Sequence, residues 1–139
     1  MDYVDLNLLG SDVFNLATTP RIIVPALGPG LIIRPAFVEA WYQFNGGPFN
    51  YTTPPRLIVS PLAQPTSRLQ WGSLDLSMLN RQMNCYNTAL LGLQPSNGIE
   101  TATLDNVPVY ISLSSPLQAT LATNSALKVR LNFLASSRH

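Results

Sequence analysis

The sequence is short of charge. Of its 139 residues, eight are Lys or Arg and seven are Asp or Glu, so charged residues make up 11% of the chain. A typical soluble domain has about 25%. The basic residues are spread from Arg21 to Arg138 without forming a run, which excludes the phosphate-tracking stripe of a nucleic-acid-binding protein. Such a surface favours a protein covered by protein partners, although an ordinary globular domain with few charges stays open.

Histidine and cysteine are nearly absent. The one histidine, His139, is the last residue, and a chain end is usually too disordered to hold a general base. Cys85 is the one cysteine, which excludes an intrachain disulfide and a cysteine-rich metal site. The seven carboxylates show no spacing that indicates a catalytic pair. We therefore expect no catalytic, cofactor-binding or metal-binding residue, and no enzymatic activity.

Long apolar runs are missing as well. Nothing approaches the roughly 18 consecutive apolar residues of a membrane span. The first ten residues, MDYVDLNLLG, are acidic and lack the hydrophobic stretch of a secretory signal. We expect no membrane partner and synthesis in a reducing cytosol.

A period of two recurs along the chain. In SALKVRLNFLA, residues Leu127, Val129, Leu131 and Phe133 alternate with polar or small residues, as in a strand with one buried face. The same reasoning predicts short strands, separated by turn residues, over 21–24, 31–33, 36–44, 56–60, 87–93, 106–115 and 125–135. About seven to nine such strands indicate an antiparallel β-sandwich or barrel.

Proline and glycine punctuate the most apolar stretch, VPALGPGLIIRP. Gly28-Pro29-Gly30 predicts a hairpin turn between two strands, with Pro25 and Pro35 limiting their pairing. A phosphate loop is excluded because no lysine and no helix follow the glycines.

Two segments depart from this strand pattern. Residues 1–15 show no clean period and predict an extended N-terminal arm, ahead of a sandwich domain over 16–139. The segment WGSLDLSMLNRQMN places Leu74, Met78 and Arg81 at helical spacing, with Ser73 as an N-cap, although its leucines also alternate as in a strand.

Aromatic residues gather around one loop, with two more further along: Trp41, Tyr42, Phe44, Phe49, Tyr51, Trp71 and Tyr86. Three interpretations are open. They are core and loop-packing residues, or a protein contact surface, or a carbohydrate platform assisted by Gln43, Asn45 and Asn50.

The order of segments resembles a known family. RIIVPALGPG, LIIRPAFVEAWYQFNGG, PFNYTTPPRLIVS and the closing pair NVPVYISLSSP and SALKVRLNFLA are similar in arrangement to the small jelly-roll cement, or decoration, proteins of tailed-bacteriophage capsids. The resemblance covers most of Pro20 to Ala135 and implies an all-β antiparallel sandwich of jelly-roll type.

The resemblance also implies a role. Such proteins are virion components, made in the host cytoplasm, that bind the major capsid protein outside the head. They sit as homotrimers at threefold and quasi-threefold positions and tie capsid subunits together. The alternative is a receptor- or carbohydrate-binding head-fibre or tail module. The contact residues expected are Tyr3, Leu6, Leu8, Leu9 and Phe14 of the arm, together with Trp41, Phe49, Tyr51, Trp71 and Arg34.

Overall fold

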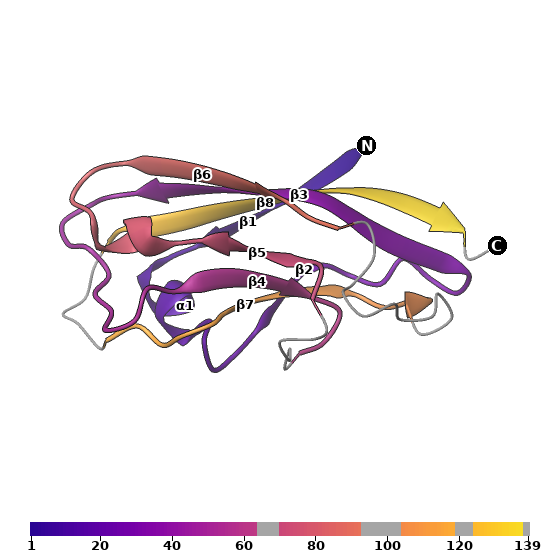
Figure 1. The fold of residues 1–139 in the computed structure, drawn as a ribbon, viewed down its shortest axis with the longest axis horizontal. Coiled ribbons are helices and arrows are strands. Elements are labelled where there is room, and N and C mark those ends of the chain that lie inside the picture. The colour runs from indigo at the N-terminus through magenta and orange to yellow at the C-terminus, as the bar shows by residue number, and fades with distance from the viewer. Residues whose placement is uncertain (64–69, 93–103, 119–123, 138–139) are drawn as a thin grey trace.

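The computed structural model describes residues 1–63, 70–92, 104–118 and 124–137 of the chain. These residues form two β-sheets that pack face to face as a sandwich (Figure 1). The elements, in chain order, are β1 (Asp2–Leu8), α1 (Gly10–Asn15), β2 (Arg21–Val24), β3 (Leu31–Gln43), β4 (Arg56–Ser60), β5 (Gly72–Asp75), the 3-10 helix η1 (Ser77–Asn80), β6 (Cys85–Leu90), β7 (Val109–Leu113) and β8 (Ala126–Ser137).

The strand order identifies the fold. One sheet has the order β1-β8-β3-β6 and the other β2-β7-β4-β5, with every neighbouring pair antiparallel. The first strand pairs with the last, the second with the seventh, the third with the sixth and the fourth with the fifth. This nested pairing is that of an eight-stranded jelly roll. The predicted all-β antiparallel jelly-roll sandwich is confirmed.

Alternating residues of both sheets fill the space between them. Leu127, Val129 and Leu131 of β8 are fully buried, as the period of two predicts. They meet side chains such as Leu57 and Ile111 of the second sheet, which belong to the same core cluster. Each buried aliphatic side chain contributes about 1.5–3 kcal/mol relative to exposure, so this layer is the main source of stability.

The turn at Gly28–Gly30 is confirmed, but the hairpin is wrong. Gly28 and Gly30 have φ of +118° and +82°, which glycine adopts without steric cost, and the Leu31 amide donates to the Gly28 carbonyl at 3.2 Å. However, β2 pairs with β7, whereas β3 pairs with β8 and β6. The turn therefore carries the chain from one sheet to the other.

Pro35 does not end a strand. The expected strands over 31–33 and 36–44 are one continuous strand, β3, and Pro35 lies inside it. The register between β3 and β8 shifts between Pro35 and Phe37. A β-bulge is one of the few places where a strand tolerates a residue without an amide hydrogen.

The helix predicted over residues 71–84 is wrong for most of its length. Its first part is strand β5, and one short 3-10 turn, η1, follows. Leu74 and Leu76 are buried while Asp75 between them is exposed, so the alternation of the leucines decided the structure. Ser73 is not an N-cap, because it lies inside β5 and η1 begins after Leu76. Its hydroxyl instead accepts a hydrogen bond from Nε of Arg56 at 2.8 Å.

Residues 1–15, expected as an arm outside the sandwich, instead supply strand β1 and helix α1. Strand β1 pairs with β8 from Asp2 to Leu8. Leu8 and Val13 are both completely buried. In β1, Leu6 and Leu8 point inward and Asp5 points outward. The sequence does not show this alternation clearly, because Leu9 is apolar and yet exposed.

The buried position of β1 makes a direct prediction. Leu8→Ala should lower the free energy of unfolding by about 2–5 kcal/mol, because it leaves a cavity in the core. Leu9→Ala, at the neighbouring residue that is 64% exposed, should change it by less than about 0.5 kcal/mol. Chemical denaturation of both variants checks this. Equal, small effects would show that β1 is not packed against the core.

Candidate functional site

The outward side chains of the β1-β8-β3-β6 sheet form one continuous surface, which we call the platform. The strand registers arrange it in three rows, each crossing all four strands. The rows are Tyr3, Asn132, Phe37 and Leu90; then Asp5, Arg130, Glu39 and Thr88; then Asn7, Lys128, Trp41 and Tyr86.

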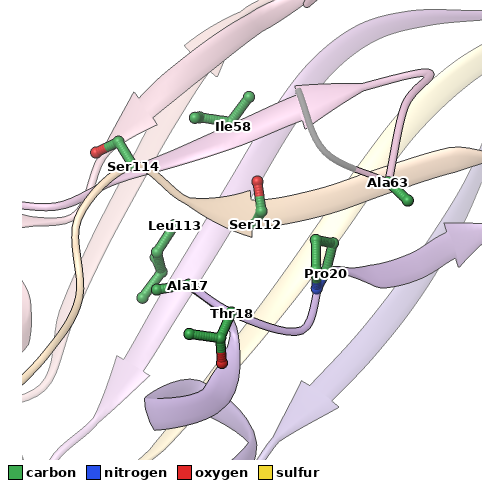
Figure 2. Close-up of a pocket in the computed structure, with 8 residues that line it drawn as sticks. All are labelled: Ala17, Thr18, Pro20, Ile58, Ala63, Ser112, Leu113 and Ser114. Atoms are coloured by element: carbon green, nitrogen blue, oxygen red, sulfur yellow. The ribbon is translucent and has the colours of Figure 1, made fainter. Parts of the chain in front are cut away.

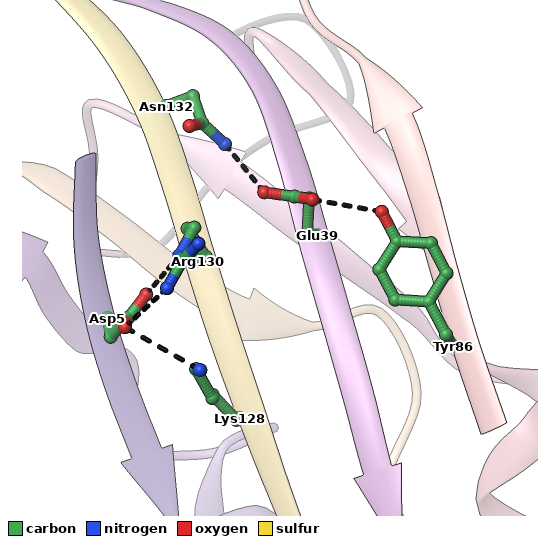
Figure 3. A network of polar contacts seen from close by, with 6 residues as sticks. All are labelled: Asp5, Glu39, Tyr86, Lys128, Arg130 and Asn132. Atoms are coloured by element: carbon green, nitrogen blue, oxygen red, sulfur yellow. Dashed lines mark hydrogen bonds and ion pairs between the residues drawn. The ribbon is translucent and has the colours of Figure 1, made fainter. Parts of the chain in front are cut away.

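Asp5 is the anchor of the charged part of the platform. Arg130 donates to both of its carboxylate oxygens, from Nε at 2.6 Å and from Nη2 at 3.0 Å, and Nζ of Lys128 lies 3.7 Å away (Figure 3). Hydrogen bonding from Arg130 lowers the pKa of Asp5 below its ordinary value, and the same pair raises the pKa of Arg130. Bidentate pairs of this kind combine strength with fixed geometry.

Glu39 is satisfied without an ion pair among the described residues. Its carboxylate accepts hydrogen bonds from the hydroxyl of Tyr86 at 2.9 Å and from Nδ2 of Asn132 at 3.0 Å (Figure 3). The bond to this carboxylate raises the pKa of Tyr86. The polar contacts thus involve side chains from all four strands of the sheet.

Aromatic rings lie between these charges. The guanidinium of Arg130 is 4.2 Å from the ring centre of Tyr3 and 5.4 Å from that of Trp41. Nζ of Lys128 is 4.8 Å from the Trp41 ring, and Tyr86 packs against Trp41 with centroids 5.2 Å apart. Tyr, Trp and Arg are the residues most enriched at the energetic centres of protein interfaces. Trp41 already contacts groups from both flanking strands, which disfavours sugar stacking on its ring.

The expected contact residues separate into three groups. Tyr3 and Trp41 both lie on the platform and both contact the guanidinium of Arg130, and Arg34 lies further along β3. Leu9 and Phe14 are exposed near α1, away from the platform rows. The remaining five are at least partly withdrawn from the surface: Leu6, Leu8, Phe49, Tyr51 and Trp71.

Leu8, Phe49 and Trp71 are core residues with at most 5% of their surface exposed, so predicting them as contact residues was wrong. Phe49 packs against Tyr42, with ring centroids 6.2 Å apart. Leu6 and Tyr51 are partly buried against the same core. The hydroxyl of Tyr51 donates to the Ser77 carbonyl at 2.7 Å, which holds the loop in place.

Sequence reasoning noted Tyr86 only among the aromatic residues and did not name the other charged and apolar members of the platform as site residues: Asp5, Glu39, Leu90, Lys128 and Arg130. The one signal available was the alternation along each strand. Lys128 and Arg130 alternate with the buried residues of β8, which predicts that they lie on a solvent-facing side but not which residues of other strands lie beside them. Those neighbours depend on pairings between residues as far apart as Asp5 and Arg130.

The other sheet presents a different surface. A shallow hollow of about 290 Å³ lies over β4 and β7. It is lined by small and uncharged residues: Ala17, Thr18, Pro20, Ile58, Ala63, Ser112, Leu113 and Ser114 (Figure 2). None of the described residues that line it is ionisable, so these residues supply no group for acid–base chemistry.

Over the described ranges, no group of three or more His, Cys, Asp or Glu side chains is placed to hold a metal ion. In the same part of the chain, none of the helices has the length and apolar character to cross a membrane.

Fold and surface together define a class: a jelly-roll sandwich with aromatic and charged side chains gathered on one outer sheet face. No family model matches the sequence, and no curated protein matches it.

Chains from three virus capsids are among the solved structures that are similar to this chain. A chain from the capsid asymmetric unit of cyanophage Pam1 has 14% identity and a TM-score of 0.46, and the alignment covers 94% of this chain and 80% of that one. A chain from the acid-stable capsid of Helicobacter pylori bacteriophage KHP30 has 9% identity and a TM-score of 0.31, with 98% of both chains covered. A chain from the empty capsid of Triatoma virus has 15% identity and a TM-score of 0.33, covering 98% and 87%. Similarities this low do not establish a shared function.

The Asp5 network predicts a pH-dependent contribution to stability. Asp5→Asn should lower the free energy of unfolding by about 0.5–1 kcal/mol at neutral pH, as for a well-formed exposed ion pair. Because the folded pKa lies below the ordinary value of 3.8, this stabilisation is complete above 3.8 and is lost as the pH falls through the folded pKa.

Denaturation of the wild type and the variant from pH 7 down to pH 2 measures this difference. Asp2→Asn, on the same strand but without an ion pair to a described residue, is the matched control. A difference between wild type and Asp5→Asn that persists unchanged at the lowest pH would contradict the assignment.

Proposed function

We propose that this chain is a structural protein of a virus particle: a capsid cement protein that binds the outside of a tailed-phage head. In this proposal it acts as a homotrimer at threefold and quasi-threefold positions and ties together neighbouring major capsid subunits. The observation that carries the proposal is the platform, a layer of Tyr, Trp and Arg side chains on an eight-stranded jelly roll, a fold that viral capsid domains share with lectins and cupins.

The platform is suited to docking because its charges are already partnered. Burying an unpaired charge is costly, whereas a charge that keeps its hydrogen-bonded partner can be covered by another protein at lower cost. Asp5 keeps Arg130 and Lys128, and Glu39 keeps Tyr86 and Asn132. A partner that covers these residues therefore gains apolar contact with Tyr3, Trp41 and Leu90 without first having to neutralise the surface.

The low overall charge agrees with a structural role. Few solvated side chains must be stripped of water when several faces of a protein are covered by neighbours. A trimer that engages its partner at three equivalent points also gains avidity from contacts that are individually modest.

The decisive experiment adds the purified protein to particles of the source virus assembled without it. Bound copy number and the temperature at which the heads rupture are measured, and the mass of the free protein in solution gives its oligomeric state. Saturable binding with a raised rupture temperature supports the proposal. Binding to host cells or glycans in place of particles would support the receptor-binding alternative.

Leu90 offers a sharp variant because it is 88% exposed at the edge of the platform. Leu90→Asp should weaken binding to particles at least about tenfold, since a charge introduced into an apolar contact costs 1.4 kcal/mol or more. Ile22→Asp makes the same change on the opposite sheet, at a residue that is 47% exposed, and should bind like the wild type. Equal binding by both variants would show that the platform is not the docking face.

A further inference from the structure

Strands β3 and β8 continue past their flanking strands. The pairing of β1 with β8 ends at Asp2 and Phe133, and the pairing of β6 with β3 ends at Leu90 and Phe37. Beyond these points β3 and β8 pair further, as far as Leu31 and Ser137. Residues 31–35 and 133–137 thus form a two-stranded extension of the sheet, which we call the ribbon; it is the right-hand end of β3 and β8 in Figure 1.

The ribbon is held firmly on one side. The amide of Asn106 donates to the Leu31 carbonyl at 2.9 Å. In return, the side chains of Asp105 and Asn106 accept hydrogen bonds from the amides of Gly30 at 2.6 Å and Gly28 at 3.0 Å. Ile32 and Ile33 are buried. A partner that binds the ribbon therefore meets an ordered surface and has little conformational entropy to remove.

Arg34 lies on this ribbon with spare hydrogen-bonding capacity. Its Nε donates to the hydroxyl of Ser136 at 2.9 Å, which positions the guanidinium across the two strands. Within the described residues it forms no ion pair, whereas Arg21 pairs with Asp12 and Arg130 with Asp5. The two terminal nitrogens of Arg34 are the groups that usually complete a bidentate contact with a carboxylate.

The strand pairing places apolar side chains next to Arg34. Leu134, directly opposite Arg34 on β8, is 39% exposed. The next outward row of the platform carries Tyr3 and Leu90 at its two ends. A cation bordered by exposed apolar groups is recognised best by a surface that offers a carboxylate among apolar side chains, which is the chemistry of a protein segment. A phosphate backbone would require further cations along its path, and among the residues that the structure describes no other cation lies in these two rows.

We propose that Arg34 binds a carboxylate on a partner protein, within an apolar segment that also covers Leu134 and Leu90. The inference rests on the proposed function, because the partner is the protein that docks on the platform. It adds the chemistry of that partner: an acidic side chain, or a chain-terminal carboxylate, between apolar residues. The ribbon is then one end of the docking surface, and the contact of Arg34 with this carboxylate fixes how the platform is positioned on the partner.

The chain offers a direct test because Lys128 is its one lysine. In the double variant Arg34→Lys, Lys128→Arg, the one remaining lysine amine lies at the ribbon, and a carbodiimide joins it to a carboxylate in contact with it. The variant is bound to particles of the source virus that lack the protein, treated with carbodiimide, and digested for mass spectrometry. Lys128→Arg alone, which has no lysine, is the control for reaction at the N-terminal amine.

A cross-link from residue 34 to an Asp, a Glu or a terminal carboxylate of another polypeptide, absent from the control, is the expected result. Arg34→Gln should also weaken binding about tenfold, the usual effect of losing a hydrogen-bonded charge pair. Binding of the double variant without such a cross-link, together with unchanged affinity of Arg34→Gln, would overturn this inference and leave the docking role intact. Failure of the wild type to bind particles would instead overturn the proposed function.

Discussion

The long antiparallel pairing of β3 with β8 is the constraint on which the rest of the structure depends. It joins residues 31–43 to residues 126–137, segments that are far apart in the sequence. β1 can then add to the free edge of β8, and β6 to the free edge of β3. The inner residues of this pair supply the centre of the core, while its outer residues supply the middle of the platform. Stability and surface chemistry thus come from opposite faces of the same two strands.

The platform shows how a chain with few charges can use them locally. Asp5, Glu39, Lys128 and Arg130 lie on adjacent strands and are tied together or to neighbouring polar side chains. Aromatic rings of Tyr3, Trp41 and Tyr86 separate and cover them. The outer face of the opposite sheet is hollowed where small uncharged residues line it. The two faces of the sandwich therefore offer different chemistry to their surroundings.

Local patterns predicted the strands well where the alternation was clean. The segments 21–24 and 56–60 match β2 and β4 in full, and the alternation in 125–135 predicted most of β8. Errors arose where a local signal competed with a nonlocal one. Pro35 favoured a strand end. However, β3 pairs with β8 on both sides of Pro35, and a bulge next to this residue accommodates its missing amide hydrogen. Leu74 fitted both a helical and an alternating pattern, and pairing with Leu57 decided for the strand.

The candidate site was predictable only in part, for the same reason. The sequence by itself determined which side chains alternate, where glycine and proline turn the chain, and that charge would be scarce. Only the tertiary structure decided that Phe49 and Trp71 are buried, and that Asp5 lies against Arg130 beside Trp41. The physical reason is that a strand's own residues determine which side chains share a face. Which strands lie beside it depends on the burial and hydrogen bonding of the whole sheet. Contacts between residues 2–8, 37–41, 86–90 and 128–132 have no local signature.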